Sequence, residues 1–122
     1  MMKDENQKPE DLKVRTKKFA LSIICLYSAL PKQTVAQVLG NQLLRSGTSV
    51  GTHYREAFRA KSRADFISKM EGALQELDET QYWLELLGDS GSMVQKRLQP
   101  LLDETNELVS IFVTIVKRTK DG

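Results

Sequence analysis

The chain has 122 residues, a formal net charge of +2, 40% hydrophobic residues and 28% charged residues. This composition is typical of one globular domain with its own core, and it excludes a disordered chain. No apolar run reaches the about 20 residues that a membrane-spanning helix needs, and residues 1–8 are too polar for a secretory signal. We therefore expect a cytoplasmic protein with no membrane contact. Its single cysteine, Cys25, is expected to be a small core residue.

Residues 1–8 are expected to form a mobile tail, residues 9–118 a helical domain, and residues 119–122 a C-terminal tail. A first amphipathic helix is predicted from Pro9 to the residue before Pro31, because a proline disfavours the helical conformation of its predecessor. Its apolar residues recur every three or four positions: Leu12, Phe19, Ala20, Ile23, Ile24, Tyr27 and Leu30.

A second helix is predicted from about Thr34, which is expected to be its N-cap. Its apolar stripe comprises Val35, Val38, Leu39, Leu43 and Leu44, and resumes at Tyr54, Ala57 and Phe58. Between these groups lies a run of poor helix formers, residues 46–51, in which each glycine costs about 1 kcal/mol relative to alanine. Two explanations are open: close approach to a neighbouring helix, or a polar site lined by hydroxyl groups.

A third helix is predicted to start at the capping box Ser62–Asp65 and to end at Gly88. A second capping box, residues 92–95, is expected to open a fourth helix, which Pro100 should kink or restart. With no competing strand pattern, the fold class is all-α, an antiparallel up-down-up-down four-helix bundle. The wide apolar surfaces of the second helix and of residues 108–116 suggest burial against other subunits.

Charge is distributed unevenly, because residues 45–63 are mostly basic and residues 65–89 mostly acidic. The two blocks could be complementary faces within or between subunits, or the basic block could bind nucleic acid. For the second case the candidate phosphate-binding residues are Arg55, Arg59, Lys61 and Arg63. Tyr54 or Phe58 could stack on bases nearby, although both also fit the core stripe.

Glu76 and Glu79 share one face of the third helix. They could be a solvated acidic surface, or they could pair with Arg45 or Arg55 across the bundle or a subunit boundary.

The sequence has no glycine-rich phosphate loop, no His/Cys metal spacing and no convincing nucleophile set. His53 is the single histidine, which excludes the paired Glu-x-x-His motifs of a di-iron bundle. We therefore expect a protein that is not an enzyme and that uses no metal and no cofactor.

Five stretches together carry a family resemblance: Ala29–Pro31, Gln42–Gly51, Tyr54–Ala57, Ala64–Phe66 and Glu76–Leu87. They resemble the bacterial four-helix proteins encoded within intervening sequences of 23S ribosomal RNA genes. The resemblance implies an antiparallel four-helix bundle assembled as a ring-like homopentamer. That family is similar to the accessory protein of diversity-generating retroelements, a basic pentamer that binds nucleic acid and a reverse transcriptase.

The resemblance also assigns residues to polar family motifs that are expected at interfaces. These residues are Arg45, Ser46, Ser49 and Glu56 in the second helix and Glu76, Glu79 and Gln81 in the third. His53 stands where the family commonly has Asn, so any subunit contact made there is expected to depend on pH. The function expected is a non-enzymatic oligomeric bundle that binds RNA or DNA through its basic surface. The alternative is a protein-interaction scaffold or accessory subunit without direct nucleic-acid binding.

Overall fold

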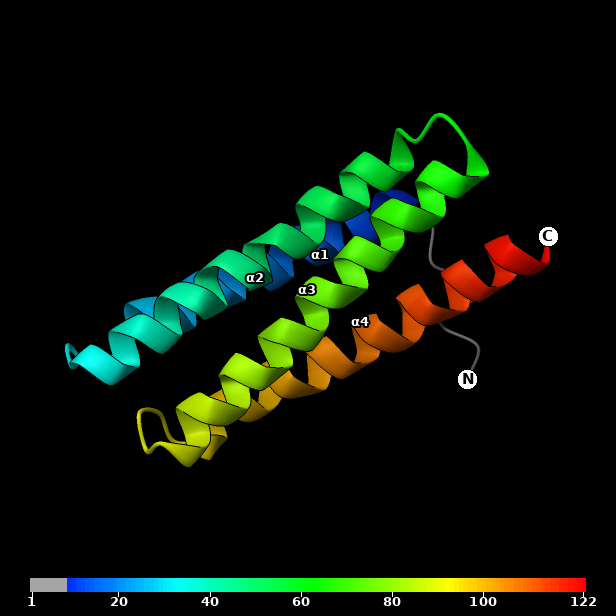
Figure 1. Ribbon diagram of the computed structural model, residues 1–122. Coiled ribbons are helices and arrows are strands. Elements are labelled where there is room, and N and C mark those ends of the chain that lie inside the picture. Colours follow the sequence, from blue (N-terminus) through cyan, green and yellow to red (C-terminus); the bar gives the residue numbers. More distant parts are fainter. Residues whose placement is uncertain (1–8) are drawn as a thin grey trace.

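Residues 9–122 are described by a computed structural model, in which four α-helices follow one another through short connections (Figure 1). They are α1 (Pro9–Ser28), α2 (Thr34–Phe58), α3 (Arg63–Asp89) and α4 (Gln95–Asp121). Within these residues there is no strand, so the all-α prediction is confirmed. The expected tail at residues 1–8 lies outside the described residues, and residues 119–121, expected in a C-terminal tail, are part of α4.

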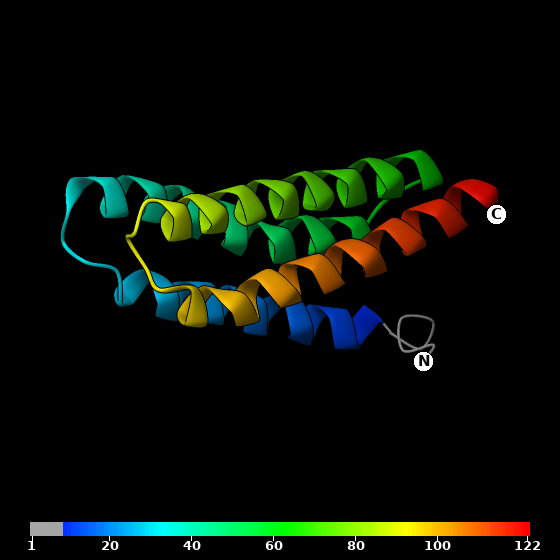
Figure 2. The same cartoon turned by 90° about the horizontal axis from the view of Figure 1, so that it is seen from below.

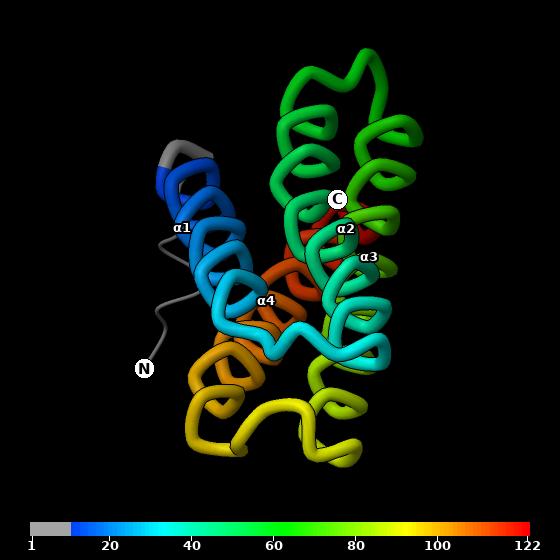
Figure 3. Tube along the Cα trace, turned by 90° about the vertical axis from the view of Figure 1, so that its left-hand side faces the viewer, coloured from blue at the N-terminus to red at the C-terminus, as the bar shows by residue number. Residues whose placement is uncertain are grey.

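Consecutive helices run in opposite directions and pack as a four-helix bundle (Figures 1 and 2). The most extensive contact joins α2 to α3, whereas α1 and α4 touch over a short length. Viewed from the side in Figure 3, α2 and α3 lie side by side, with α1 and α4 on the other side of the core. The predicted up-down-up-down order is therefore present.

The core is a single cluster to which all four helices contribute. On α1 the buried positions are spaced alternately by four and three residues: Leu12, Thr16, Phe19, Ile23 and Leu26. This spacing turns Ile24 outward, where it is 42% exposed. Cys25 is also exposed, so its predicted place in the core was wrong. The predicted apolar stripe of α1 therefore included Ile24, which is exposed, and omitted Leu26, which is buried.

The predicted apolar stripe of α2 needs the same correction, because Val35, Val38 and Phe58 are exposed. The positions that face the core are mostly small or polar: Ala36, Gly40, Leu43, Ser46, Gly47, Val50, Tyr54 and Ala57. The apolar second half of α4, in contrast, is largely buried inside the bundle, through Leu108, Ile111 and Phe112.

The helix ends agree with the predictions only in part. Ser62 caps α3, since its Oγ accepts a hydrogen bond from the Asp65 N–H at 3.0 Å. Thr34 is not a cap: Gln33 holds that position with an extended backbone and no side-chain bond. The N-cap of α4 is likewise Val94 instead of Ser92, whose hydroxyl lies 2.9 Å from that of Ser90.

The predicted end of α3 was also wrong. Gly88 does not end α3, which continues to Asp89; the left-handed conformation that favours glycine occurs at Gly91, with φ of 75°. Of the two effects expected of Pro100, a kink or a restart, the restart does not occur, because α4 is one continuous helix from Gln95 to Asp121 with Pro100 inside it.

The small-residue run of α2 is a close contact with α1. A Cβ atom built on Gly47 would lie 2.7 Å from Cγ1 of Ile23, a fully buried residue of α1. Real Cβ atoms do not approach this closely, so at this point the two helices reach their separation with glycine at position 47. The explanation by close approach is therefore confirmed.

Candidate functional site

A network of charged side chains joins α2 to α3 along their common face. Arg45 lies between two carboxylates of α3: its Nη1 is 3.3 Å from Oε1 of Glu76, and its Nη2 donates to Glu79. Glu76 is shielded from solvent, with 14% of its side chain exposed, whereas about half of Arg45 is exposed. The predicted pairing of Arg45 with Glu76 and Glu79 is confirmed, and it occurs within one chain.

His53, about two helical turns after Arg45 on α2, extends this network. Its Nε2 lies 3.5 Å from Oε2 of Glu76, and its Nδ1 lies 3.6 Å from Oε1 of Glu56. The imidazole rests on Gly72 of α3, where a Cβ atom would lie 3.0 Å from Nδ1. Lys69 approaches Glu56 at 3.8 Å. His53 is thus enclosed between two carboxylates of its own chain.

The remaining residues of the predicted polar motif have different surroundings. Ser46 is fully buried, and its Oγ lies 2.8 Å from Oγ1 of Thr80, which itself donates to the Glu76 carbonyl. Ser49 donates to the Arg45 carbonyl, one turn earlier in α2, at 2.6 Å. Gln81 bonds along its own helix to Glu85 at 3.3 Å. Through Ser46 and Thr80 the motif therefore connects α2 to α3.

The four residues predicted to bind phosphate gather around the turn between α2 and α3. Arg55 is in the last turn of α2, Arg59 is its C-cap, Lys61 is in the turn, and Arg63 is the first residue of α3. All four are exposed. Within the described part of the chain, Arg55, Arg59 and Lys61 form no ion pair, in contrast to Arg45.

Two other helices reach the same end of the bundle (Figure 2). The Nη2 of Arg63 donates to the Gly122 carbonyl at 3.0 Å, which brings the end of α4 close to the turn. From α1, Nζ of Lys13 lies 4.4 Å above the centre of the Phe58 ring. We call this region the basic end, and its cations are Lys13, Lys17, Arg55, Arg59, Lys61, Arg63, Lys117, Arg118 and Lys120.

Sequence reasoning missed the contributions of α1 and α4 to the basic end. The signal was available, because an antiparallel arrangement places the start of α1 and the end of α4 beside the α2–α3 turn. Carboxylates are fewer here than cations, and they are Asp11, Glu56, Asp65, Glu71 and Asp121. Lys120 pairs with Glu71 at 3.1 Å. The basic end thus keeps an excess of positive charge.

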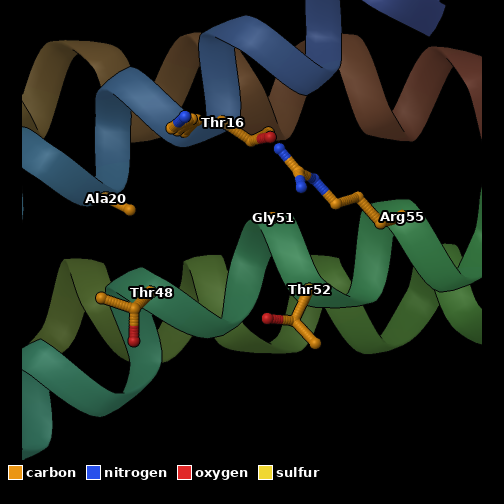
Figure 4. A pocket seen from close by; sticks show the side chains of 7 residues that line it. Thr16, Ala20, Thr48, Gly51, Thr52 and Arg55 are labelled. Carbon is orange, nitrogen blue, oxygen red and sulfur yellow. The ribbon is translucent and has the colours of Figure 1, made fainter.

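A depression of about 230 Å³ opens between α1 and α2 next to the basic end (Figure 4). Its lining residues are Thr16, Lys17, Ala20, Thr48, Gly51, Thr52 and Arg55. The side chain of Arg55 extends from α2 toward α1 across it. Lys17 and Arg55 give the depression two cations, and neither forms an ion pair with a described residue.

Arg15 connects α1 to α4, a contact that sequence reasoning also missed. Its guanidinium donates to both carboxylate oxygens of Glu104, at 2.8 and 2.9 Å, and to Glu107 at 2.6 Å. The hydrogen bonds to Glu104 raise the pKa of Arg15 above its usual range, while partial burial acts in the opposite direction. Arg15 is therefore bound by carboxylates of its own chain and links α1 to α4.

Residues 9–122 contain neither a candidate metal site nor a candidate membrane span. No group of three or more His, Cys, Asp and Glu side chains is arranged to hold a metal ion. Nor does any helix in this range have the length and hydrophobicity required to span a membrane.

Comparisons with known proteins agree with the fold. No protein of curated function matches the sequence. A crystal structure of a protein of unknown function from the S23 ribosomal protein family of Bacteroides thetaiotaomicron is 38% identical, with a TM-score of 0.84 over 91% of this chain and 99% of that one. Residues 10–114 match the family of 23S rRNA-intervening sequence proteins. With a match over most of its length, this chain belongs to the family of 23S rRNA-intervening sequence proteins.

Proposed function

We propose that this chain is a non-enzymatic, cytoplasmic nucleic-acid-binding protein that uses the basic end as its contact surface and needs no cofactor. The observation that carries the proposal is the convergence of exposed cations from α1, α2, α4 and the α2–α3 turn. Cations that are not neutralised by neighbouring carboxylates can replace the counterions of a phosphate backbone. Arg55, Arg59 and Lys61 meet this condition.

We further propose that the chain assembles into a homo-oligomer, with a pentameric ring as the expected form. Support comes from the exposed apolar side chains on the outer face of α1, namely Val14, Leu21 and Ile24, whose spacing of seven and three residues places them on one stripe. Val35 and Val38 add exposed apolar surface at the start of α2. Apolar surface of this kind on a helical protein is typical of contacts between subunits.

The test of nucleic-acid binding is fluorescence anisotropy with labelled RNA and DNA oligonucleotides over a series of salt concentrations. Wild-type affinity should fall steeply as salt rises. The charge-removing variant Arg55→Gln/Arg59→Gln should bind more weakly, and the slope of log K against log salt should become shallower by about 1.4, since each single-strand phosphate contact contributes about 0.7.

A matched control exists at the opposite end of the bundle, where Lys96 and Arg97 are exposed in the first turn of α4. Lys96→Gln/Arg97→Gln removes the same charge but should leave affinity and slope near the wild-type values. If both double variants lost the same affinity, the nucleic acid would be attracted by the net charge of the protein alone, and the basic end would not be its specific contact surface. Absence of salt-sensitive binding by the wild type would refute the proposal.

Light scattering tests the assembly, for which a pentamer predicts a mass of about 69 kDa, five times the 13.8 kDa of one chain. Leu21→Glu should lower this mass if the stripe on α1 is buried between subunits. A wild-type monomer would refute the assembly without affecting the nucleic-acid proposal.

The second candidate function is a protein-interaction scaffold or accessory subunit, for example of a reverse transcriptase. The same exposed stripe on α1 favours this candidate, because it could receive another protein in place of a second copy. A stoichiometric protein partner that is retained by Arg55→Gln/Arg59→Gln but lost by Leu21→Glu would favour the scaffold over the nucleic-acid-binding function.

A further inference from the structure

Phe58 is an aromatic residue left on the surface in the middle of the basic end. It is the last residue of α2 and is 47% exposed. Exposing a phenylalanine gives up the free energy of burying a large apolar side chain, about 1.5–3 kcal/mol when burial is complete. Nothing in the packing of α2 requires this, because the core position of this turn is held by Ala57.

The neighbouring aromatic residue of α2 has the opposite role. Tyr54 is 4% exposed, and its ring stacks on Phe112 of α4 with 5.7 Å between ring centres. Both rings were candidates for stacking on bases. The structure removes Tyr54 from consideration, because its ring is in the core, and it leaves Phe58.

The surroundings of Phe58 supply cations on several sides. Lys13 of α1 lies over the ring, 4.4 Å from its centre. Arg55 lies one turn earlier in α2, and Arg59 follows directly in sequence. Lys17, one turn beyond Lys13 on α1, lines the depression together with Arg55. The Phe58 ring and the depression lined by Lys17 and Arg55 therefore both lie along the edge where α1 meets α2.

Single strands and duplexes use such a surface differently. An unpaired base has an open π-face that can stack on an aromatic side chain, whereas bases within a duplex are already stacked on each other. Duplex recognition without base readout would require only the cations. A ring at the centre of the cations therefore favours a single strand.

We propose that the α1–α2 edge of the basic end binds single-stranded nucleic acid, with an unpaired base stacked on Phe58 and adjacent phosphates bound by Arg55 and Lys17. This inference rests on the proposed nucleic-acid-binding function and adds the strandedness and the base contact. Stacking is tolerant of sequence, because every base has a π-face. The same chemistry is present in RNA and in DNA.

The test compares Phe58→Leu with the wild type by anisotropy, using a single-stranded RNA, a DNA of the same sequence and the corresponding duplexes. Leucine keeps an apolar side chain beside Lys13 but cannot stack. Loss of one stacked base, worth about 1–3 kcal/mol, corresponds to a loss of single-strand affinity of about 5- to 150-fold. The salt slope should not change, since no cation is removed.

Two variants control the interpretation. Tyr82→Leu removes an exposed aromatic ring, 54% accessible, from the other half of the molecule and should not alter binding. Phe58→Trp preserves stacking and should retain wild-type affinity. Circular dichroism checks that each variant keeps its helix content.

The outcomes separate this inference from the function on which it rests. If Phe58→Leu binds single strands as tightly as the wild type while Arg55→Gln/Arg59→Gln loses affinity, the base contact is refuted and the nucleic-acid function stands. Duplex binding as tight as single-strand binding would also overturn the inference. Failure of the wild type to bind any oligonucleotide at low salt would overturn both. A difference between RNA and DNA of one sequence would identify which of them is the ligand.

Discussion

Replacement of Gly47 by alanine tests the close contact between α2 and α1. The new Cβ atom would lie 2.7, 3.0 and 3.1 Å from Cγ1, Cγ2 and Cδ1 of Ile23. Ile23 is fully buried, so its branched side chain has little room to move away. Alanine in place of glycine should stabilise a helix by about 1 kcal/mol, whereas overpacking of a core costs about 1–3 kcal/mol. Gly47→Ala should therefore lower the free energy of unfolding by up to about 2 kcal/mol.

A double-mutant cycle with Ile23→Ala separates these two effects. Ile23→Ala alone should cost about 2–5 kcal/mol through lost burial and the cavity it leaves. It also removes all three atoms that crowd position 47. In this background Gly47→Ala should stabilise the protein by about 1 kcal/mol, so the coupling between the two substitutions should be about 1–3 kcal/mol.

Urea unfolding followed by circular dichroism at one fixed protein concentration measures the cycle, because an oligomer's stability depends on concentration. Gly51→Ala provides a comparison on the same helix, since its new Cβ atom would lie 3.2 Å from Oγ1 of Thr16 and would require a shift of only a few tenths of an ångström. If Gly47→Ala stabilises the protein by about 1 kcal/mol in both backgrounds, the helices do not approach as described and the argument from glycine fails.

Four further substitutions have defined outcomes. Arg15→Ala should lower the free energy of unfolding by about 1–2 kcal/mol in thermal or urea unfolding, because it removes the bidentate link between α1 and α4; since the raised pKa keeps Arg15 charged at every pH near neutrality, its own titration should add no pH dependence there. Ser46→Ala should cost about 1 kcal/mol by removing the buried contact with Thr80, whereas Ser49→Ala, which loses only a bond within α2, should change stability by less than about 0.5 kcal/mol. Gly72→Ala should displace the His53 ring from α3 and shift its NMR resonances while circular dichroism remains unchanged.

The four helices could be predicted because apolar residues with a helical period are separated by short polar breaks. The pairing of Arg45 with Glu76 and Glu79 could also be inferred from the sequence. Two carboxylates three residues apart share a helix face, and the guanidinium group of arginine can donate to both. The inward face of α1 was harder to predict: Ile24 and Cys25 are as apolar as Leu26, and only packing against α2 and α4 decides which of them is buried. The N-cap predictions failed for α2 and α4, where Gln33 and Val94 hold the position without a side-chain hydrogen bond, although a polar residue stood nearby in each case.

Which cations meet at the basic end depends on the topology of the bundle. For this reason the sequence predicted only some of these cations. Arg55, Arg59, Lys61 and Arg63 are neighbours in sequence and were visible as a cluster. The cations of α1 and α4 join them because antiparallel packing returns distant segments to the same end. Phe58 likewise has the periodicity of a core residue, and only the structure shows that Ala57 is buried in its place.

Arg15 and Arg45 differ in their contacts from Arg55 and Arg59. Arg15 and Arg45 are each held by two carboxylates of neighbouring helices, so a phosphate would have to displace both carboxylates to bind them. Arg55 and Arg59 have no such competitor within residues 9–122. The polar motif around Arg45 and His53 therefore sets the alignment of α2 on α3, a role that buried or half-buried ion pairs can serve without adding much stability. Arg55 and Arg59, near the C-terminal end of α2, form no ion pair with any described residue, and this difference from Arg15 and Arg45 is the reason for proposing the basic end as the nucleic-acid contact.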